Sequence, residues 1–381
     1  MHLMSKLLPA AIALIASGGA FAQEVVKIGH VGPLSGPLAH LGKDNENGAR
    51  MALEDLNAKG FAINGKKVKL ELVSEDDAAD PKQGAAAAQK LVDAKVNGVI
   101  GHQSSGTTMP ASKIYFDAGI PQISPSATTP QYTRQGFNTT FRVVANDNKL
   151  GSTLGSYAVK TMKAQRIAVI DDRMAYGQGV ADEFVKGVKA AGNPNLIVGR
   201  EFTNPNATDF TAILTTLKAR KPDLVFYGGM DSVAGPLLKQ MKSLGFTARM
   251  LGGDGVCTEA MAALSGDAMG EPGKVVCAEA GGVSGAQEKV LIDFKARYKK
   301  KFNQETQVYA PYVYDAIMAM TTAMQHAKSA DPAKYLPELK KIHYQGVTGM
   351  IAFDDKGDIK DGALTLMTFK DAKRVKLEVV R

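Results

Sequence analysis

Apolar stretches typical of buried strands alternate with stretches of helical periodicity from residue 25 to residue 252. The expected strands are 25–31, 68–73, 96–100 and 120–124 in a first series, then 166–171, 196–202, 224–227 and 249–252. The expected helices are 44–57, 81–93 and 107–117, then 150–162, 177–191, 210–219 and 231–244. Asp80 followed by Pro81 predicts the start of the second of these helices, as its N-cap and first residue. This alternation predicts an α/β fold of two doubly wound units, each a parallel sheet with helices on both faces.

The last third of the chain has a different pattern. Helices are expected at 288–302, 309–326 and 332–341, with little strand between them. Because these helices cannot form a core on their own, we expect them to cover one of the earlier sheets. Three alternating segments, 349–354, 364–369 and 375–380, predict a small antiparallel meander with a turn at Asp355–Asp358.

A loop rich in hydroxyl groups follows the strand that ends at Ile100. It contains Ser104–Thr108 and leads to Pro110, a residue that helices tolerate in their first turn. Free N–H groups, the helix dipole and nearby hydroxyls suit such a place to a carboxylate. The alternative interpretation is that the serines and threonines only cap the helix.

Similar turns follow other strands of both predicted sheets. The stretch Ser124–Pro130 is a second hydroxyl-rich loop in the first unit, and Tyr176, Gly228–Asp231 and Gly252–Gly255 follow strands of the second. Ligands of open α/β sheets bind beyond the carboxyl ends of the strands. Hydroxyl and N–H groups suit a carboxylate and Asp254 suits an ammonium group, so together they predict a site for an α-amino acid.

Other functions find less support in the sequence. The net charge of +8 is spread along the chain without a nucleic-acid-binding motif, and no G-x-S-x-G, P-loop or H-E-x-x-H pattern occurs. No cofactor is expected. The alternatives are a metal site at His30 and His102, an exported hydrolase that uses Ser104 or Ser105 with His102, and a sensor ectodomain, which the missing membrane helix disfavours.

The first 22 residues have the pattern of a secretory signal peptide. Lys6 precedes the apolar run 7–16, and Ala20–Ala22 forms an A-x-A cleavage site. We therefore expect an exported protein. Export favours a disulfide between the two cysteines, Cys257 and Cys277, over the alternative of two buried thiols.

The motifs resemble the periplasmic leucine/isoleucine/valine-binding proteins of ABC transporters over essentially the whole mature length. The matching stretches are Ser35–Pro37, Asp76–Ala78, Asp80–Gln83, Ile100–His102 with Ser105, Ser126–Thr128, Tyr176–Gly177, Tyr227–Gly229 and Asp354–Asp358. The resemblance implies two lobes joined by three crossings, near Val144, Cys277 and Gly346. The implied parts are a first lobe of 23–144 and 278–346, and a second of 145–277 and 347–381.

The resemblance also implies roles for individual residues. Ser105 and Thr128 would bind the ligand carboxylate, while Thr128 and the carbonyl of Ser126, next to Ala127, would bind the ammonium group. Tyr176 would reach over from the second lobe, and Tyr309 would form a wall of the side-chain pocket. The implied protein is not an enzyme but a monomeric periplasmic receptor that delivers an amino acid, most simply an aliphatic one, to a membrane permease.

Several positions depart from the family pattern. Asp254 stands where a glutamate is usual, and Met230 and Leu41 stand where aromatic residues are usual. Ala79 and Ser104 stand where some members carry a disulfide, and Gln103 adds a polar group near the side-chain pocket. We therefore expect a retained zwitterion site with an altered side-chain pocket, which leaves another amino acid or a short amide as an alternative ligand.

Overall fold

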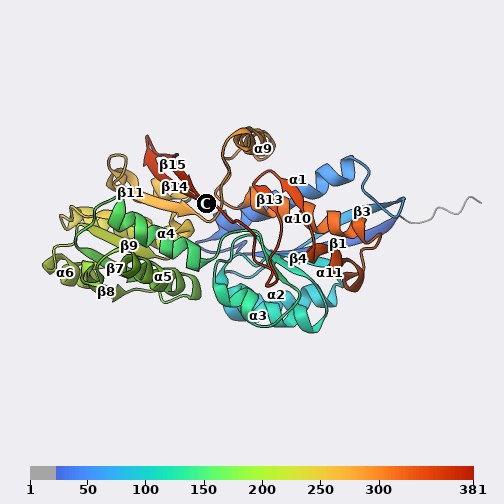
Figure 1. Ribbon diagram of the computed structural model, residues 1–381, viewed down its shortest axis with the longest axis horizontal. Coiled ribbons are helices and arrows are strands. Elements are labelled where there is room, and N and C mark those ends of the chain that lie inside the picture. Colours follow the sequence, from blue (N-terminus) through green and yellow to red (C-terminus); the bar gives the residue numbers. More distant parts are fainter. Residues whose placement is uncertain (1–22) are drawn as a thin grey trace, which may run out of the picture.

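The computed structural model describes residues 23–381, so the expected signal peptide, 1–22, lies outside the described residues. Within residues 23–381, the apolar stretches of the helices fall short of what crossing a bilayer requires. The described chain forms two α/β lobes that lie side by side (Figure 1). The predicted fold class is therefore confirmed.

The first lobe is built on a six-stranded sheet in the order β2-β3-β1-β4-β5-β6. Every pairing in it is parallel except the short pairing of β2 with β3. The strands are β1 (Glu24–Gly32), β2 (Ala62–Ile63), β3 (Lys66–Asp76), β4 (Gly98–Ile100), β5 (Gln122–Ser124) and β6 (Thr140–Arg142).

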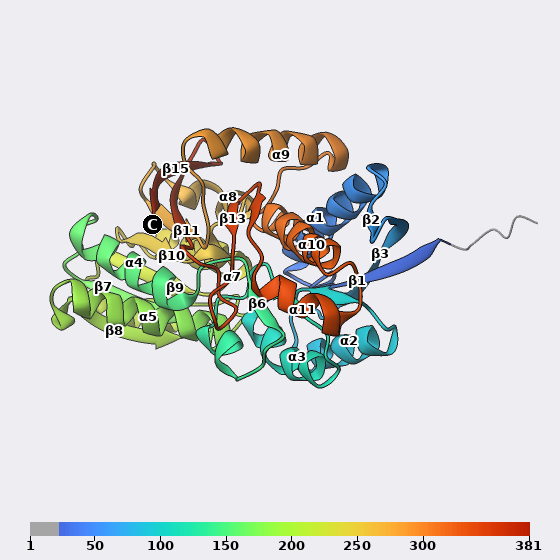
Figure 2. The same cartoon turned by 45° about the vertical axis from the view of Figure 1, so that its right-hand side comes forward.

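Helices cover both faces of this sheet (Figure 1). One face carries α2 (Pro81–Asp93) and α3 (Ser105–Asp117), and the other carries α1 (Ala39–Ala58) and α10 (Ala310–His326). The short α11 (Pro332–Lys340) packs on α10, and α9 (Ala286–Phe302) lies across the top of the molecule in Figure 2. The late helices therefore return to the first lobe. Their lack of strand partners predicted that they cover one of the earlier sheets, and the family resemblance implied the first lobe.

The second lobe contains a seven-stranded sheet in the order β15-β14-β11-β10-β9-β7-β8. Its strands are β7 (Ile167–Asp171), β8 (Ile197–Phe202), β9 (Leu224–Gly228), β10 (Arg249–Gly252), β11 (Val275–Glu279), β14 (Leu364–Lys370) and β15 (Lys373–Val380). Its helices are α4 (Asp147–Lys160), α5 (Ala175–Ala191), α6 (Thr211–Ala219), α7 (Asp231–Ser243) and α8 (Ala260–Ser265).

The expected C-terminal meander is wrong. β14 pairs antiparallel with β11 and with β15, so these two strands extend the second sheet. β13 (Gly349–Ile351) instead pairs with β12 (Tyr344–Gly346) in a separate two-stranded sheet. The alternating pattern predicted strands correctly but did not specify their partners, because an open edge of a distant sheet can accept them equally well.

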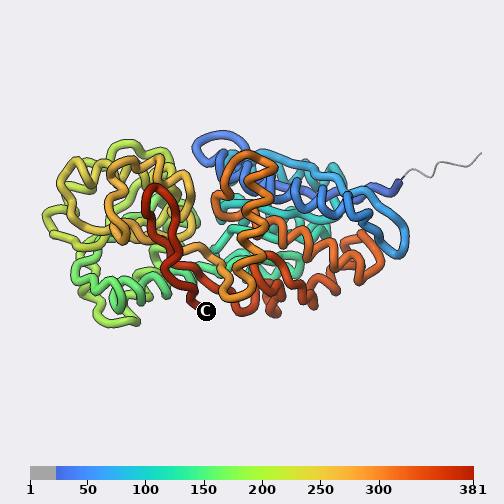
Figure 3. Tube along the Cα trace, turned by 90° about the horizontal axis from the view of Figure 1, so that it is seen from above, coloured from blue at the N-terminus to red at the C-terminus, as the bar shows by residue number. Residues whose placement is uncertain are grey.

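Three segments connect the lobes, at residues 143–146, 280–285 and 352–363. The path is visible in Figure 3, where the red C-terminal hairpin lies with the green and yellow lobe. The second connection begins after Glu279 rather than at Cys277, because β11 continues to that residue. The third begins after Ile351 rather than at Gly346, because the β12–β13 turn intervenes.

Helix α3 begins earlier than its proline suggested. Ser104 is the extended N-cap residue, and its carbonyl accepts hydrogen bonds from the N–H groups of Thr107 (3.2 Å) and Thr108 (3.0 Å). Pro110 is therefore the sixth residue of the helix and not part of its first turn. The earlier start places the small residues Ser105 and Gly106 in the first turn, at the carboxyl edge of the sheet.

A disulfide joins Cys257 and Cys277, whose Cα atoms are 5.3 Å apart. It links the turn after β10 to strand β11 within the second lobe. Of the two alternatives that export left open, the bridge is therefore correct, and the described residues contain no free cysteine.

Candidate ligand-binding site

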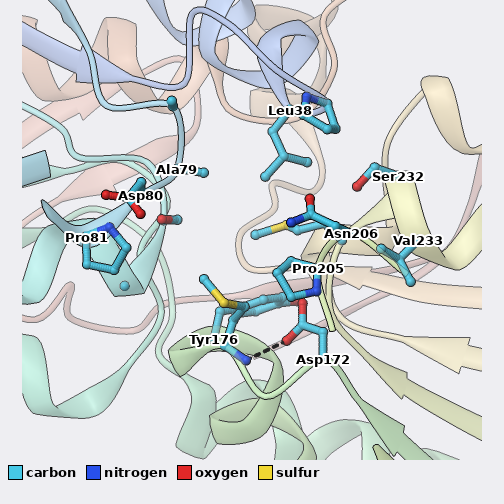
Figure 4. A pocket seen from close by; sticks show the side chains of 16 residues that line it. Leu38, Ala79, Asp80, Pro81, Asp172, Tyr176, Pro205, Asn206, Ser232 and Val233 are labelled. Carbon is cyan, nitrogen blue, oxygen red and sulfur yellow. Dashed lines mark hydrogen bonds between the residues drawn. The ribbon is translucent and has the colours of Figure 1, made fainter. Parts of the chain in front are cut away.

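A cavity of about 420 Å³ lies between the lobes, at the carboxyl ends of both parallel sheets (Figure 4). The first lobe lines it with the loop after β1, the N-terminus of α2 and the N-terminus of α3. The second lobe contributes the turns that precede α5 and α7 and the loop after β8. Of the predicted site residues, Ser104, Tyr176 and Met230 line this cavity directly.

Asp254 is the centre of a buried cluster next to this cavity. Its side chain is almost inaccessible, with 1% of the residue exposed. The hydroxyl of Tyr176 donates to Oδ1 at 2.7 Å, and the hydroxyl of Tyr309 donates to Oδ2 at 2.7 Å. Because Tyr309 comes from the first lobe and the other two from the second, the carboxylate is a point at which the two lobes meet.

The backbone around Asp254 requires small residues. The N–H of Gly255 donates to the Tyr176 hydroxyl at 3.0 Å, and a Cβ atom on Gly253 would lie only 2.5 Å from that oxygen. Burial raises the pKa of the Asp254 carboxyl, and the hydrogen bonds from Tyr176 and Tyr309 oppose this effect. Because each oxygen of the carboxylate accepts one tyrosine hydroxyl and has two lone pairs, the Asp254 side chain can accept a further hydrogen bond.

The two hydroxyl-rich loops of the first lobe are hydrogen-bonded to each other. Ser126 Oγ donates to the carbonyl of Gln103 at 2.8 Å, and the N–H of Thr129 donates to Ser105 Oγ at 3.3 Å. Thr128 is fully buried, and its hydroxyl has no partner among the described residues. The hydroxyl nevertheless lies close to the carboxyl of Asp147, whose pKa it lowers.

Asp147 is a further acid beside the second of these loops, and no sequence motif indicated it. This residue opens α4, and its N–H donates to the carbonyl of Thr128 at 2.8 Å. Its carboxylate is fully buried, and neither oxygen has a hydrogen-bond partner within residues 23–381. Burial raises the pKa of this carboxyl to about 7, and the hydroxyl of the neighbouring Thr128 opposes that rise. The side chain of Asn146 caps this helix, which indicates where α4 begins but not that the neighbouring carboxylate is buried.

The remaining predicted site residues form the surroundings of this centre. Leu41 is fully buried on α1, and Met230 is the half-buried N-cap residue of α7. Gln103 is buried with its side-chain carbonyl unpartnered among the described residues. The carbonyl of Ala127 accepts from Arg142 Nη1 at 3.0 Å and is therefore occupied. Ala79 and Ser104 both line the cavity.

The two histidines of the alternative interpretations serve the packing of the first lobe. His102 is fully buried, with Asp77 Oδ2 3.1 Å from Nδ1 and the Tyr115 hydroxyl 3.1 Å from Nε2. Neither nitrogen is left for Ser104 or Ser105, so the hydrolase has no general base there. Burial lowers the pKa of His30 to about 4. Within the described range, no cluster of three metal-ligating side chains includes either histidine.

Two α/β lobes that enclose a cavity beside a buried acid and a buried hydroxyl define a two-lobed ligand-binding protein. A family model described as periplasmic binding protein matches residues 25–374. The chain is 35% identical over 358 residues to the leucine-, isoleucine-, valine-, threonine-, and alanine-binding protein of Pseudomonas aeruginosa, with 94% of this chain and 93% of the relative covered. The chain therefore belongs to the periplasmic binding protein family.

Further relatives agree with this assignment. An amino acid binding protein of Pseudomonas aeruginosa is 38% identical over 339 residues, which cover 88% of this chain and 87% of that protein. The branched-chain amino acid transporter substrate binding protein LivJ of Streptococcus pneumoniae, solved in complex with isoleucine, has a TM-score of 0.84 at 27% identity. That match covers 94% of this chain and 99% of LivJ. Membership of a family of binding proteins confirms the expectation that this chain is not an enzyme.

Proposed function

We propose that the protein binds a free α-amino acid between its lobes and delivers it to the permease of an ABC importer. One observation carries the proposal: a buried carboxylate, Asp254, and a buried hydroxyl, Thr128, come from turns at the facing edges of the two lobes. An acid suits an ammonium group, and a hydroxyl beside free N–H groups suits a carboxylate. The two together match the two charges of an amino acid.

The proposed contacts assign each charge to one side of the cleft. Ser105 and Thr128 bind the ligand carboxylate, next to the N-terminus of α3. Asp254, with the carbonyl of Ser126, binds the ammonium group, and Tyr176 holds the Asp254 carboxylate in place. The hydrogen bond from Tyr309 to Asp254 reaches across the cleft, so ligand access requires the lobes to separate at the three connections.

The ligand side chain is proposed to be aliphatic. Leu41 and Met230 are apolar, and the cavity beside Tyr176 is lined mainly by carbon atoms. The relatives named for leucine, isoleucine and valine point the same way. The unpartnered side-chain carbonyl of Gln103 supports the second candidate, a ligand whose side chain carries an N–H donor, such as another amino acid or a short amide.

The cellular role follows from the family. We propose that the protein acts in the periplasm as a monomer, and that closure around the ligand brings the two lobes into the relative position that the permease recognises. No catalytic step and no cofactor is involved.

A thermal-shift screen against the twenty amino acids tests the proposal. A ligand present at a hundred times its dissociation constant adds about 2.7 kcal/mol to the free energy of unfolding. We expect such a shift with one or more of L-leucine, L-isoleucine and L-valine. L-leucine methyl ester, which lacks the negative charge, and isoamylamine, which lacks the carboxylate altogether, are the matched controls and should give no shift. Equal shifts with these amines would contradict the proposed carboxylate site.

A further inference from the structure

A second contact crosses the cleft, outside the amino-acid site. His40 is the second residue of α1 in the first lobe, and Asp231 is the first residue of α7 in the second lobe. His40 Nε2 lies 2.7 Å from Asp231 Oδ2. Asp231 is fully buried, whereas 26% of the His40 side chain is exposed. The pair therefore lies at the border between the closed cleft and solvent.

Asp231 has no competing cation within the described residues. Its Oδ2 also accepts a hydrogen bond from the Thr258 hydroxyl at 2.5 Å, and its Oδ1 is buried without a partner. No salt bridge other than the one with His40 includes Asp231 in the part of the chain that the structure describes. Loss of this one cationic neighbour therefore leaves the Asp231 carboxylate buried without a compensating charge.

The groups that face His40 favour its protonated form. Besides Asp231 they are the Pro37 carbonyl and the carboxylate of Asp44, one turn along α1. Asp44 accepts hydrogen bonds from backbone N–H groups, including those of Gln307 (3.0 Å) and Ala310 (3.0 Å). Burial alone would lower the pKa of His40, but the hydrogen bond to Asp231 and the charge of that carboxylate outweigh it, and the pKa is raised.

We propose that His40 and Asp231 form a proton-dependent latch, which holds the lobes together when His40 is charged and weakens when it is neutral. When the lobes separate, His40 loses Asp231 from the other lobe and becomes an ordinary exposed histidine. The closed form then binds a proton more tightly than the open form. Because a bound amino acid requires the closed form, ligand affinity and proton binding are linked.

The sign of the pH dependence follows from the raised pKa. The latch stabilises the closed form fully when the pH lies below the pKa of His40 in the open form, about 6.5. This stabilisation is lost as the pH rises through the higher pKa of His40 in the closed form. A partly exposed ion pair contributes up to about 1 kcal/mol, which corresponds to about a fivefold change in affinity. We therefore expect the protein to bind its amino acid about three- to fivefold more tightly at about pH 5.5 than at about pH 8.5 through this pair.

The first experiment needs no ligand. Histidine ring NMR of the full mature protein gives the pKa of each ring, and the His40→Gln variant assigns the His40 signal. We expect a raised pKa for His40 that returns to about 6.5 in Asp231→Asn. If L-leucine shifts the equilibrium further toward the closed form, the His40 pKa rises again on its addition. An ordinary pKa for His40 with and without L-leucine would overturn the latch.

The second experiment measures the linkage. The dissociation constant of L-leucine is determined by calorimetry at both pH values for the wild type, for His40→Gln and for His343→Gln. His343 is exposed, and within residues 23–381 its ring bonds only to the Lys341 carbonyl, at 2.9 Å, so its variant is the matched control. We expect His40→Gln alone to lose the three- to fivefold part of the pH dependence. A pH dependence of the dissociation constant that the wild type and both variants share arises from other titratable groups in the cleft, such as Asp147.

The latch rests on the proposed function, but the two can fail separately. Binding of L-leucine with the same pH profile in His40→Gln and the wild type rejects the latch and leaves the function intact. A raised His40 pKa that depends on Asp231, in a protein that binds none of the twenty amino acids, supports the latch and rejects the function.

Discussion

We expect the Asp358→Asn variant to lose about 3–5 kcal/mol of its free energy of unfolding, because the change leaves a buried charge without its partner. Arg142 is fully buried, and its Nε lies 2.9 Å from Asp358 Oδ1. Its Nη1 also donates to the carbonyls of Ala127 (3.0 Å) and Thr129 (2.8 Å). The pair therefore joins the third connection between the lobes to the loop that carries Thr128.

Denaturant unfolding at about pH 7, where Asp358 is ionised, measures this loss. Asp355→Asn is the matched control, because Asp355 belongs to the same turn but its side chain is 84% exposed. That variant should stay within about 0.5 kcal/mol of the wild type. A similarly small change in Asp358→Asn would show that the pair does not stabilise the fold. In the Asp358→Asn background, Arg142→Met should lower the free energy of unfolding by less than it does in the wild type, because the two residues act as a unit.

The same pair should make the protein sensitive to acid. Burial alone would raise the pKa of Asp358, but the charge of Arg142 and the hydrogen bonds from Arg142 and Thr133 outweigh it, and the pKa is lowered. The carboxylate therefore stabilises the protein above the unfolded-state value of about 3.8, and this contribution is lost as the pH falls through the lower folded-state value. Asp358→Asn should abolish this part of the acid dependence.

The Asp254→Asn variant is expected to bind its amino acid about ten- to a hundredfold more weakly, the scale of one hydrogen bond to a charged group. Asparagine keeps the shape of the side chain and one oxygen for a tyrosine hydroxyl, but it removes the charge that faces the ligand ammonium group. Calorimetric titration with the amino acid that gives the largest thermal shift measures the change.

Asp267→Asn serves as the control for this measurement. Asp267 belongs to the same lobe, but its side chain is 87% exposed and pairs with Lys242 at the surface. Its variant should bind like the wild type. If Asp254→Asn also kept the wild-type dissociation constant, Asp254 would not be the ammonium ligand. Unfolding curves of both variants would show whether a loss of binding reflects the site or the fold.

Local features of the chain were predicted well. Asp80 followed by Pro81 predicted the start of α2, and the Asp80 side chain indeed accepts from the N–H groups of Lys82 and Gln83, each at 2.9 Å. The predicted strands of the two parallel sheets lie within two residues of β1–β10 where both are defined, except at the end of β3, which continues three residues beyond the predicted end. These features depend on residues a few positions apart, and periodicity and capping report such relations directly.

The site was predicted only in part. The turn glycines and Asp254 could be recognised after β10, and Tyr309 was expected only to form a wall of the pocket. The structure shows instead that the Tyr309 hydroxyl donates to Asp254. Asp147 was missed because nothing within its own segment indicates that the fold buries its carboxylate.

The sequence alone predicted the alternation of the longer strands and helices, the two-unit division and the residue types at the carboxyl edges, since each is encoded by neighbours along the chain. It did not predict the short elements β2, β6, β11, β12 and α8. Only the tertiary structure decided which of those residues meet. Arg142 and Asp358 are 216 positions apart, and His40 and Asp231 are 191 apart. Such pairs form because the three connections hold the two lobes next to each other. Burial of a charge without a partner then costs free energy, so these buried charges are paired.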